Sequence, residues 1–289
     1  MPRIAVIGPG AIGSLAATWL CQDSNNQVIV CARTPFEDLS VETPDGVITA
    51  EPEVRLTPGA RDPVDWILVA TKAYDSAAAA SWFPGLLGEE TQLAILQNGV
   101  DHVERFSLFL PAERILPVIV DCPTERVSPG KILQRGAATM DVPYSTTGAS
   151  YCELFSNTDI TASQNSHFKE AAWRKLCINA AGAVNALTLQ PARIANDEHA
   201  AYLMRRIVEE AVAVGLAEDV NLDSDLANEV VEIYRKQPGD STNSLLADRM
   251  AGGPMEIDLR NGIIVKLGKR HGIPTPYNNM SVELLKVGG

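Results

Sequence analysis

Residues 4–13 read Ile4-Ala5-Val6-Ile7-Gly8-Pro9-Gly10-Ala11-Ile12-Gly13, and this stretch decides the fold class. The apolar run at 4–7 predicts a short buried strand, and residues 14–21 predict a helix. Glycines between a strand and a helix let the backbone approach a pyrophosphate at the helix N-terminus. We therefore predict that a dinucleotide binds along Gly8, Pro9, Gly10, Ala11, Ile12 and Gly13; a glycine-rich turn without a ligand is the alternative.

Further apolar runs along the first half of the chain extend this prediction to a whole domain. They lie at 28–31, 66–70 and 93–96, and the segments between them are long enough for crossover connections. Strands spaced in this way predict an α/β fold with a parallel, doubly wound sheet of the Rossmann type. Short β-like pieces with Pro and Gly at 115–144 are expected to close off this sheet.

The pattern becomes helical from about residue 167 onward. We expect an all-helical C-terminal domain with helices at 170–189, 198–217, 223–236 and 256–270. His271-Gly272 followed by Ile273-Pro274 predicts that the last of these ends with Gly272 in a left-handed conformation. The predicted domains are therefore a dinucleotide-binding domain at 1–165 and a helical domain at 166–289.

The composition argues against several classes of partner. A formal net charge of -12 over 289 residues repels polyanions, so we expect no nucleic-acid partner. The five cysteines are scattered and have no histidine at metal-ligand spacing, which predicts no metal site and a reducing compartment. No apolar run approaches the roughly 20 residues that span a bilayer, and the first strand begins too early for a signal peptide. We expect a cytoplasmic protein without a membrane partner, and a homodimer is left open.

The end of the second predicted strand indicates which dinucleotide binds. A chain that binds NAD places Asp or Glu there to hold the ribose hydroxyls. Here the sequence is Val30-Cys31-Ala32-Arg33-Thr34, without a carboxylate. The guanidinium of Arg33 is suited to a 2′-phosphate, so NADPH is the expected cofactor. An exposed loop arginine is the alternative.

Polar residues also follow the third and fourth predicted strands. Lys72 comes after the run at 66–70, and Asn98 after the run at 93–96. The carboxyl ends of parallel strands line the ligand crevice, so we predict that both residues contact the cofactor. Taken alone, Lys72 would be a solvated lysine and Asn98 a turn residue ahead of Gly99.

Together with motifs in the second half, these features resemble the 2-dehydropantoate 2-reductase (ketopantoate reductase) family, whose members reduce a 2-keto acid with NADPH. The resemblance spans nearly the whole chain. It rests on the ordered set Gly8–Gly13, Arg33, Thr71-Lys72-Ala73, Gln97-Asn98-Gly99, Trp173-Arg174-Lys175-Leu176-Cys177-Ile178-Asn179, Ser244-Leu245-Leu246-Ala247-Asp248, Glu256-Ile257-Asp258 and Asn261-Gly262.

The resemblance implies a role for each of these polar residues. Lys175 would be the catalytic acid, and Glu256 would pair with it. Asn179 would hold the substrate, and Ser244 would bind its carboxylate end. Asn98 would lie near both the substrate and the nicotinamide. Lys72 would lie near the nicotinamide. The spacing agrees in part, because Lys175 and Asn179 are i and i+4 and share one face of a helix.

The chemistry explains why a lysine suits this place. Hydride addition to a ketone puts negative charge on its oxygen, which an ammonium neutralises by a hydrogen bond and then by proton transfer. Each residue also has an interpretation without the resemblance. Lys175 would be a surface lysine, and Glu256 would be an acidic residue in the first turn of a helix. Ser244 would be an ordinary helix or cap hydroxyl, and Asn179 would be a hydrogen-bonded polar residue on a buried helix.

Some positions depart from the family pattern. Where the family usually has a second asparagine one turn after Asn179, this chain has Ala183, and the next asparagine is Asn185. Near Ser244, the asparagine is the adjacent Asn243 rather than a residue three positions earlier. The region at 121–124 also differs, so the reaction class carries over better than the substrate.

The leading expectation is NADPH-dependent reduction of ketopantoate to (R)-pantoate for pantothenate synthesis. One alternative is a reductase of the same fold that acts on a different 2-keto acid. Another is an NADPH-binding sensor without turnover, against which the presence of both Lys175 and Glu256 argues.

Overall fold

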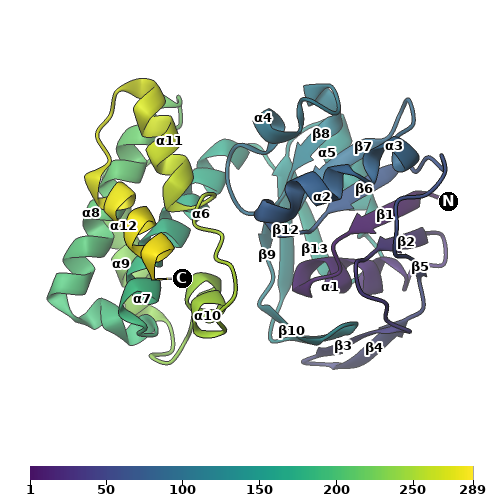
Figure 1. Cartoon of the computed structure of the whole chain (residues 1–289), viewed down its shortest axis with the longest axis horizontal. Coiled ribbons are helices and arrows are strands. Elements are labelled where there is room, and N and C mark those ends of the chain that lie inside the picture. Colours follow the sequence, from purple (N-terminus) through teal and green to yellow (C-terminus); the bar gives the residue numbers. More distant parts are fainter. Residues whose placement is uncertain (289) are drawn as a thin grey trace. The chain divides into compact units, whose positions relative to one another are not determined.

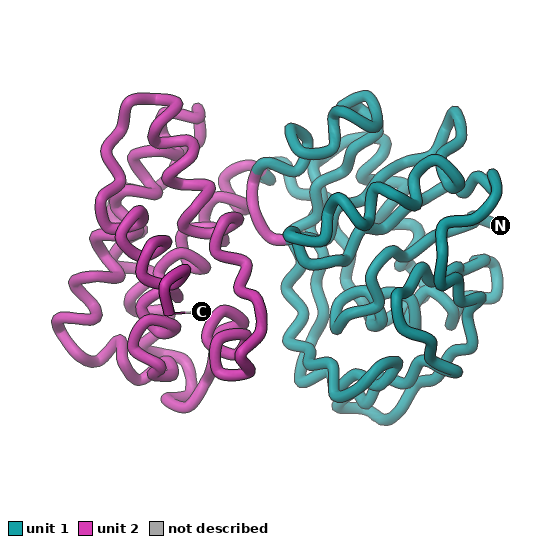
Figure 2. The backbone as a smooth tube through the Cα atoms, in the orientation of Figure 1, with its two compact units in different colours: residues 1–97, 101–168 teal, residues 98–100, 169–289 magenta. Residues whose placement is uncertain are grey.

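The protein is described by a computed structural model that covers residues 1–288. The chain divides into two compact units (Figure 2). Unit 1 contains residues 1–97 and 101–168, and unit 2 contains residues 98–100 together with residues from 169 onward. Each unit has its own hydrophobic core.

Unit 1 is built on a parallel sheet of six strands (Figure 1). Counted in chain order, the strands lie in the spatial order 3-2-1-4-5-6, which is the order of a Rossmann fold. Every neighbouring pair in this sheet is parallel. The strands are β1 (Arg3–Ile7), β2 (Gln27–Cys31), β5 (Glu53–Arg55), β6 (Trp66–Val69), β7 (Gln92–Ile95) and β8 (Ile115–Pro117). The predicted fold class is thus confirmed.

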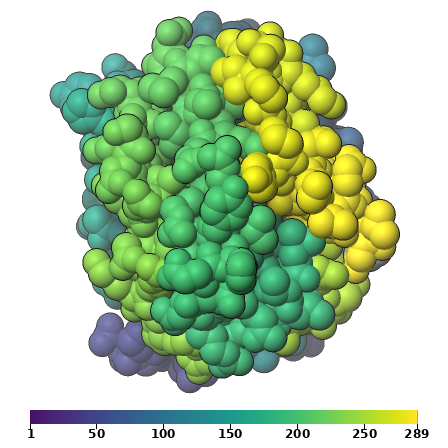
Figure 3. Space-filling model, turned by 90° about the vertical axis from the view of Figure 1, so that its left-hand side faces the viewer, coloured from purple at the N-terminus to yellow at the C-terminus, as the bar shows by residue number. Residues whose placement is uncertain are grey.

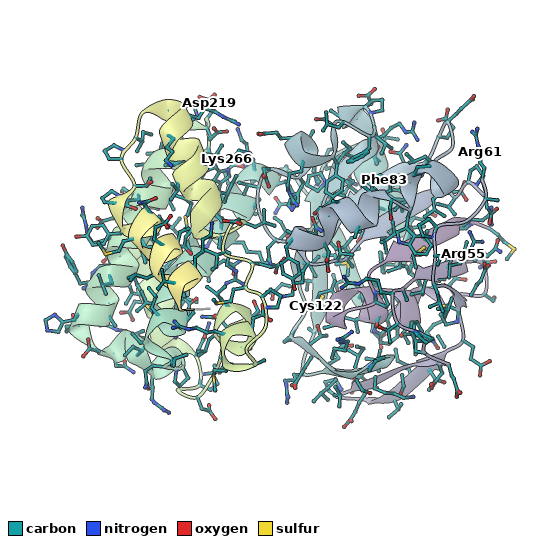
Figure 4. The ribbon with its side chains drawn as sticks, viewed as in Figure 1. Arg55, Arg61, Phe83, Cys122, Asp219 and Lys266 are labelled. Atoms are coloured by element: carbon teal, nitrogen blue, oxygen red, sulfur yellow. The ribbon has the colours of Figure 1, made fainter. Side chains whose placement is uncertain are left out.

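The central strands are largely apolar because both faces of the sheet are covered. Successive residues alternate between two cores: Ile4 and Val6 pack on one side, and Ala5 and Ile7 on the other. The first side is covered by α1 (Ala11–Leu20) and α5 (Thr146–Leu154), and the second by α2 (Ser76–Ala80), α3 (Phe83–Leu86) and α4 (His102–Phe106). Phe83, labelled in Figure 4, belongs to the second core and contacts the ring of Phe106.

Two smaller sheets complete unit 1. The expected short strands at 115–144 are present, but apart from β8 they pair elsewhere than in the main sheet. A hairpin also connects β2 to β5 where a helix would be usual, and it turns at Gly46 with φ +140°. The strands are β3 (Leu39–Thr43), β4 (Gly46–Ala50), β9 (Ile119–Asp121), β10 (Thr124–Ser128), β11 (Lys131–Gln134), β12 (Ala138–Pro143) and β13 (Ile160–Asn165), with short 3₁₀ turns η1 (Ala73–Asp75) and η2 (Ala112–Arg114) between other elements.

Unit 2 is helical. Its helices are α6 (Phe168–Ala181), α7 (Ala183–Thr188), α8 (Glu198–Ala217), α9 (Leu226–Lys236), α10 (Ser244–Met250), α11 (Asn261–His271) and α12 (Pro276–Val287), with the 3₁₀ turn η3 (Ala192–Asn196). Their main core joins α6, α8, α9 and α11. Figure 3 shows one face of this unit, on which the middle of the chain (green) packs against the C-terminal helices (yellow).

Two of the predicted helices have different limits in the structure. The helix expected at 170–189 is interrupted at Gly182, where a Cβ would lie 2.7 Å from the Tyr234 hydroxyl and 2.8 Å from Nδ2 of Asn243. The helix expected at 256–270 begins only at Asn261, because the N–H groups of Arg260 and Gly262 both bond the carbonyl of Ile257 and form a turn. Glu256 therefore precedes α11 and is not in its first turn.

The end of the same helix agrees with the sequence. α11 stops at His271, and Gly272 has the left-handed φ of +68°. The helix expected at 223–236 begins three residues later, at Leu226. None of the helices within residues 1–288 is long and apolar enough to cross a membrane.

The cysteines form no disulfide among themselves. Burial raises the pKa of Cys31 and of Cys177 to about 12, so both thiols stay protonated at neutral pH. Cys122, labelled in Figure 4, follows β9 and is half-buried. The two buried thiols are therefore part of the packing and are not nucleophiles.

Candidate active site

The glycine-rich turn of unit 1 contains glycines of two kinds. A Cβ at Gly13 would lie 2.2 Å from the carbonyl oxygen of Gly8, and Gly8 itself has a φ of +91° with the backbone of Thr71 close by. These two glycines are required by the fold. Gly10 has a φ of -75° and no heavy atom within 4 Å of the place of a Cβ. The fold alone does not require a glycine at this position.

The open space at Gly10 adjoins the N-terminus of α1. Gly10 is the N-cap residue, no side chain caps the helix, and its first turn has no acidic residue. The first amides of a helix have no partner within the helix, and the helix dipole favours an anion there. This end of α1 thus provides backbone donors and room for a phosphate group.

Arg33 lies directly beyond β2, as the sequence predicts, but it is held by a carboxylate from another loop. Its guanidinium donates two hydrogen bonds to Asp75, of 3.2 and 2.9 Å. The Arg33 side chain is 78% exposed, so the pair is open to solvent and weak. Asp75 is a carboxylate at this edge of the sheet that the sequence alone did not reveal, because it follows β6 and not β2.

The loops after β6 and β7 are joined by a buried glutamine. Nε2 of Gln97 donates to the carbonyl oxygen and to the hydroxyl of Thr71, at 3.0 and 3.1 Å. Nη1 of Arg105 in turn donates to Oε1 of Gln97 at 2.7 Å. Lys72 directly follows Thr71, is half-buried and forms the N-cap of η1. The loop that carries Lys72 is therefore fixed relative to the residue before Asn98.

Unit 2 brings three of the predicted residues into one hydrogen-bonded chain. Nδ2 of Asn98 donates to Oε2 of Glu256 at 3.3 Å, and Nδ2 of Asn179 has a longer contact of 3.5 Å with Oδ1 of Asn98. Asn179 and Lys175 both lie on α6, one turn apart, and both are half-buried. Glu256 is 7% exposed. Residues from three distant parts of the sequence thus form one cluster within unit 2.

Ser244 joins this cluster through an arginine that the sequence analysis missed. Nη2 of Arg260 donates to Oγ of Ser244 at 2.6 Å, and Nη1 donates to the carbonyl oxygen of Asn179 at 3.4 Å. Arg260 is 3% exposed, whereas Ser244 is exposed at the start of α10. The only signal in the sequence was a charged residue between the motif at 256–258 and Asn261-Gly262, which does not reveal burial.

Asn185 and Asn243, the two asparagines near the positions that depart from the family pattern, both form hydrogen bonds with the backbone. Nδ2 of Asn185, in α7, donates to the carbonyl oxygen of Gln190 at 3.0 Å. Asn243 caps α10, since its Oδ1 accepts from the N–H of Leu246 at 2.9 Å, and its Nδ2 donates to the carbonyl oxygen of Gly182 at 3.2 Å. Each therefore has a structural task.

Comparison with known families covers both units. The family described as "Ketopantoate reductase PanE/ApbA" matches residues 4–146, and "Ketopantoate reductase PanE/ApbA C terminal" matches residues 167–288. The chain belongs to the ketopantoate reductase family. It is accordingly an oxidoreductase.

Individual relatives of the ketopantoate reductase family agree over the full length. The chain is 50% identical to a 2-dehydropantoate 2-reductase of Caulobacter vibrioides over 99% of this chain and 98% of that protein. A 2-dehydropantoate 2-reductase of Mycobacterium tuberculosis is 35% identical over 98% and 96%. Among solved structures, the PanE/ApbA family ketopantoate reductase of Ralstonia eutropha superposes with a TM-score of 0.90 at 28% identity, over 99% and 98% of the two chains.

Proposed function

We propose that the protein reduces 2-dehydropantoate to (R)-pantoate with NADPH, a step of pantothenate biosynthesis. The name of the 50% identical Caulobacter relative supports this substrate. The observation that carries the proposal is the cluster in unit 2, in which Asn98 is hydrogen-bonded to Glu256 and to Asn179. Asn179 lies one helical turn from Lys175 on α6. Such a cluster combines a proton donor with amide groups that can orient a carbonyl.

The pyrophosphate and the 2′-phosphate of the cofactor are assigned to unit 1. The open space at Gly10 and the uncapped end of α1 suit the pyrophosphate, and Arg33 suits a 2′-phosphate. Lys72 and Asn98 are assigned to the nicotinamide end, since both follow the carboxyl ends of strands. We accordingly take residues 1–165 as the NADP-binding domain and residues 166–289 as the substrate and catalytic domain.

The predicted site residues of unit 2 each have a task in the proposed reaction. When bound, NADPH would supply the hydride to the carbonyl carbon of the keto acid. Nζ of Lys175 donates a proton to the carbonyl oxygen, which yields a 2-hydroxy acid. Glu256 orients the ammonium, Asn179 and Asn98 hold the substrate, and Ser244 donates to its carboxylate.

One observation favours a different 2-keto acid as the alternative substrate. Ala183, the first residue of α7, stands where the family usually has an amide side chain, and the nearby Asn185 and Asn243 are already bonded to backbone carbonyls. Fewer amide groups are therefore available for a substrate hydroxyl. A pocket with fewer polar partners is expected to discriminate less against a keto acid without that hydroxyl.

The test is NADPH oxidation by the full-length protein with a panel of 2-keto acids. We expect 2-dehydropantoate to give the highest kcat/KM. A higher kcat/KM with another 2-keto acid would retain the reaction and replace the substrate. No turnover with any member of the panel, despite NADPH binding, would favour a cofactor sensor and contradict the proposal.

Replacing Arg33 tests the choice of cofactor. Arg33→Ala is expected to raise the Kd of NADPH and to leave the Kd of NADH nearly unchanged, because only NADPH carries the 2′-phosphate. Loss of a hydrogen bond to a charged group costs roughly 1.5–3 kcal/mol, which is about a 10- to 150-fold change in Kd. Titration of protein fluorescence measures both constants.

Arg61→Ala is the matched control, since Arg61 is an exposed arginine elsewhere in unit 1 (Figure 4). It should leave both constants unchanged. Equal affinities of the unaltered protein for NADPH and NADH would contradict the assignment of Arg33.

A further inference from the structure

Arg260 is a buried cation beside the cluster that carries the proposed catalytic groups. Arg260 is 3% exposed. It lies in the turn that follows Glu256, directly before α11. Its terminal nitrogens donate to Oγ of Ser244 and to the carbonyl oxygen of Asn179, two residues assigned to the substrate. Arg260 thus links the two substrate-binding positions within unit 2.

The environment of this guanidinium leaves its charge incompletely compensated. The partners of its terminal nitrogens are a neutral hydroxyl and a neutral carbonyl, and its Nε has no hydrogen-bond partner among the described residues. Burial lowers the pKa of Arg260, while the negative charges of Glu256 and Asp248 act in the opposite direction. A guanidinium stays protonated at neutral pH, so a positive charge is buried here without a hydrogen bond to a carboxylate, at a cost that an anionic ligand would offset.

The contact with Arg260 also fixes the direction of the Ser244 hydroxyl. An arginine only donates hydrogen bonds, so Oγ of Ser244 is the acceptor in this pair. The hydroxyl proton of Ser244 is then available to another acceptor. Because Ser244 is exposed, that acceptor can come from solution.

We propose that Arg260 is a positioning residue that selects an anionic substrate: it orients Ser244 as a donor to the substrate carboxylate and places a fixed positive charge behind it. Arg260 itself is too buried to contact the substrate. The positive charge also balances Glu256, whose carboxylate would otherwise repel an acid. The inference rests on the proposed function, because it assigns Ser244 to the carboxylate of a 2-keto acid.

The test compares a keto acid with its uncharged ester in the full-length protein. Steady-state rates are measured with NADPH and either 2-dehydropantoate or its methyl ester, which has the same ketone and no carboxylate. Arg260→Met is expected to raise the KM of the acid roughly 10- to 150-fold, the equivalent of one hydrogen bond to a charged group. The KM of the ester, the kcat of both substrates and the Kd of NADPH should change far less.

Arg249→Met is the matched control. Arg249 is a half-buried arginine of α10 that donates to the backbone carbonyl of Ala186, and it has no contact with Ser244. It should keep the preference for acid over ester. A merely structural role for Arg260 would lower the rates with acid and ester equally, and that result would overturn the proposal.

A second variant covers the case in which Arg260→Met does not fold. Arg260→Lys keeps the charge but lacks the planar fork that reaches both Ser244 and Asn179, so the acid-to-ester ratio should fall by a smaller factor. An unchanged ratio in a folded Arg260→Lys protein would overturn the proposal. Failure of the proposed function is distinguishable, because the unaltered protein would then reduce no 2-keto acid or would prefer one other than 2-dehydropantoate.

Discussion

Lys175→Ala is expected to lower kcat roughly 10²- to 10⁴-fold, the range for loss of a general acid. In the proposed reaction, the ammonium of Lys175 neutralises the charge that develops on the carbonyl oxygen and then donates its proton. Cofactor affinity should barely change, because the glycine-rich turn belongs to unit 1 and Lys175 to unit 2. Single-turnover rates with NADPH and 2-dehydropantoate, together with the Kd of NADPH, measure the two effects separately.

Lys169→Ala is the matched control for this experiment. Lys169 is an exposed lysine of the same helix, α6, and its ammonium donates to the backbone carbonyl of Glu218. Its removal should leave kcat unchanged. Glu256→Gln should give a smaller loss than Lys175→Ala, because the proposed role of Glu256 is to orient the lysine and not to donate the proton. Near-normal turnover of a folded Lys175→Ala protein would show that another group or a water is the donor.

Alanine at Gly10 and at Gly13 is expected to have opposite consequences. At Gly13 the new Cβ meets the carbonyl oxygen of Gly8 at 2.2 Å, so the free energy of unfolding should fall by about 1–3 kcal/mol or more. At Gly10 the Cβ meets nothing within 4 Å. The only expected cost in stability is that alanine is a less favourable N-cap residue than glycine. Gly10→Ala should therefore fold, yet bind NADPH poorly, since the Cβ occupies the space assigned to the pyrophosphate.

Thermal unfolding and NADPH titration distinguish these effects. Gly13→Ala should lower Tm by several degrees with or without cofactor. Gly10→Ala should have a nearly normal Tm in the absence of NADPH and should lose most of the stabilisation that NADPH gives the unaltered protein. Normal NADPH affinity in Gly10→Ala would contradict the assignment of this turn to the pyrophosphate.

Local patterns in the sequence were sufficient to predict the fold class. Four apolar residues before a Gly-x-Gly-x-x-Gly turn specify a strand, a tight turn and a helix, because each step depends on neighbouring residues only. The left-handed Gly272 after α11 was predictable for the same reason. The i and i+4 spacing likewise placed Lys175 and Asn179 on one face of α6.

Other limits depended on contacts between distant residues. Gly182 in the predicted helix indicated where that helix could bend, but its close approach to Tyr234 and Asn243, which leaves no room for a Cβ, is not visible in the neighbouring sequence. The late start of α11 follows from a turn closed on the carbonyl of Ile257, whereas Glu256 and its neighbours are compatible with a helix. Propensity is a weak guide when tertiary contacts compete with it.

The sequence by itself determined the parallel sheet and the glycine-rich turn, because these depend on local periodicity and spacing. The residue types of the proposed site came from the resemblance to the family. Only the tertiary structure decided which of these residues share a hydrogen bond. It paired Arg33 with Asp75, joined Asn98 to Glu256 across 158 residues and buried Arg260 against Ser244. The physical reason is that burial and hydrogen-bond partners arise from the packing of segments far apart in the chain, and no local pattern records a charge that becomes buried.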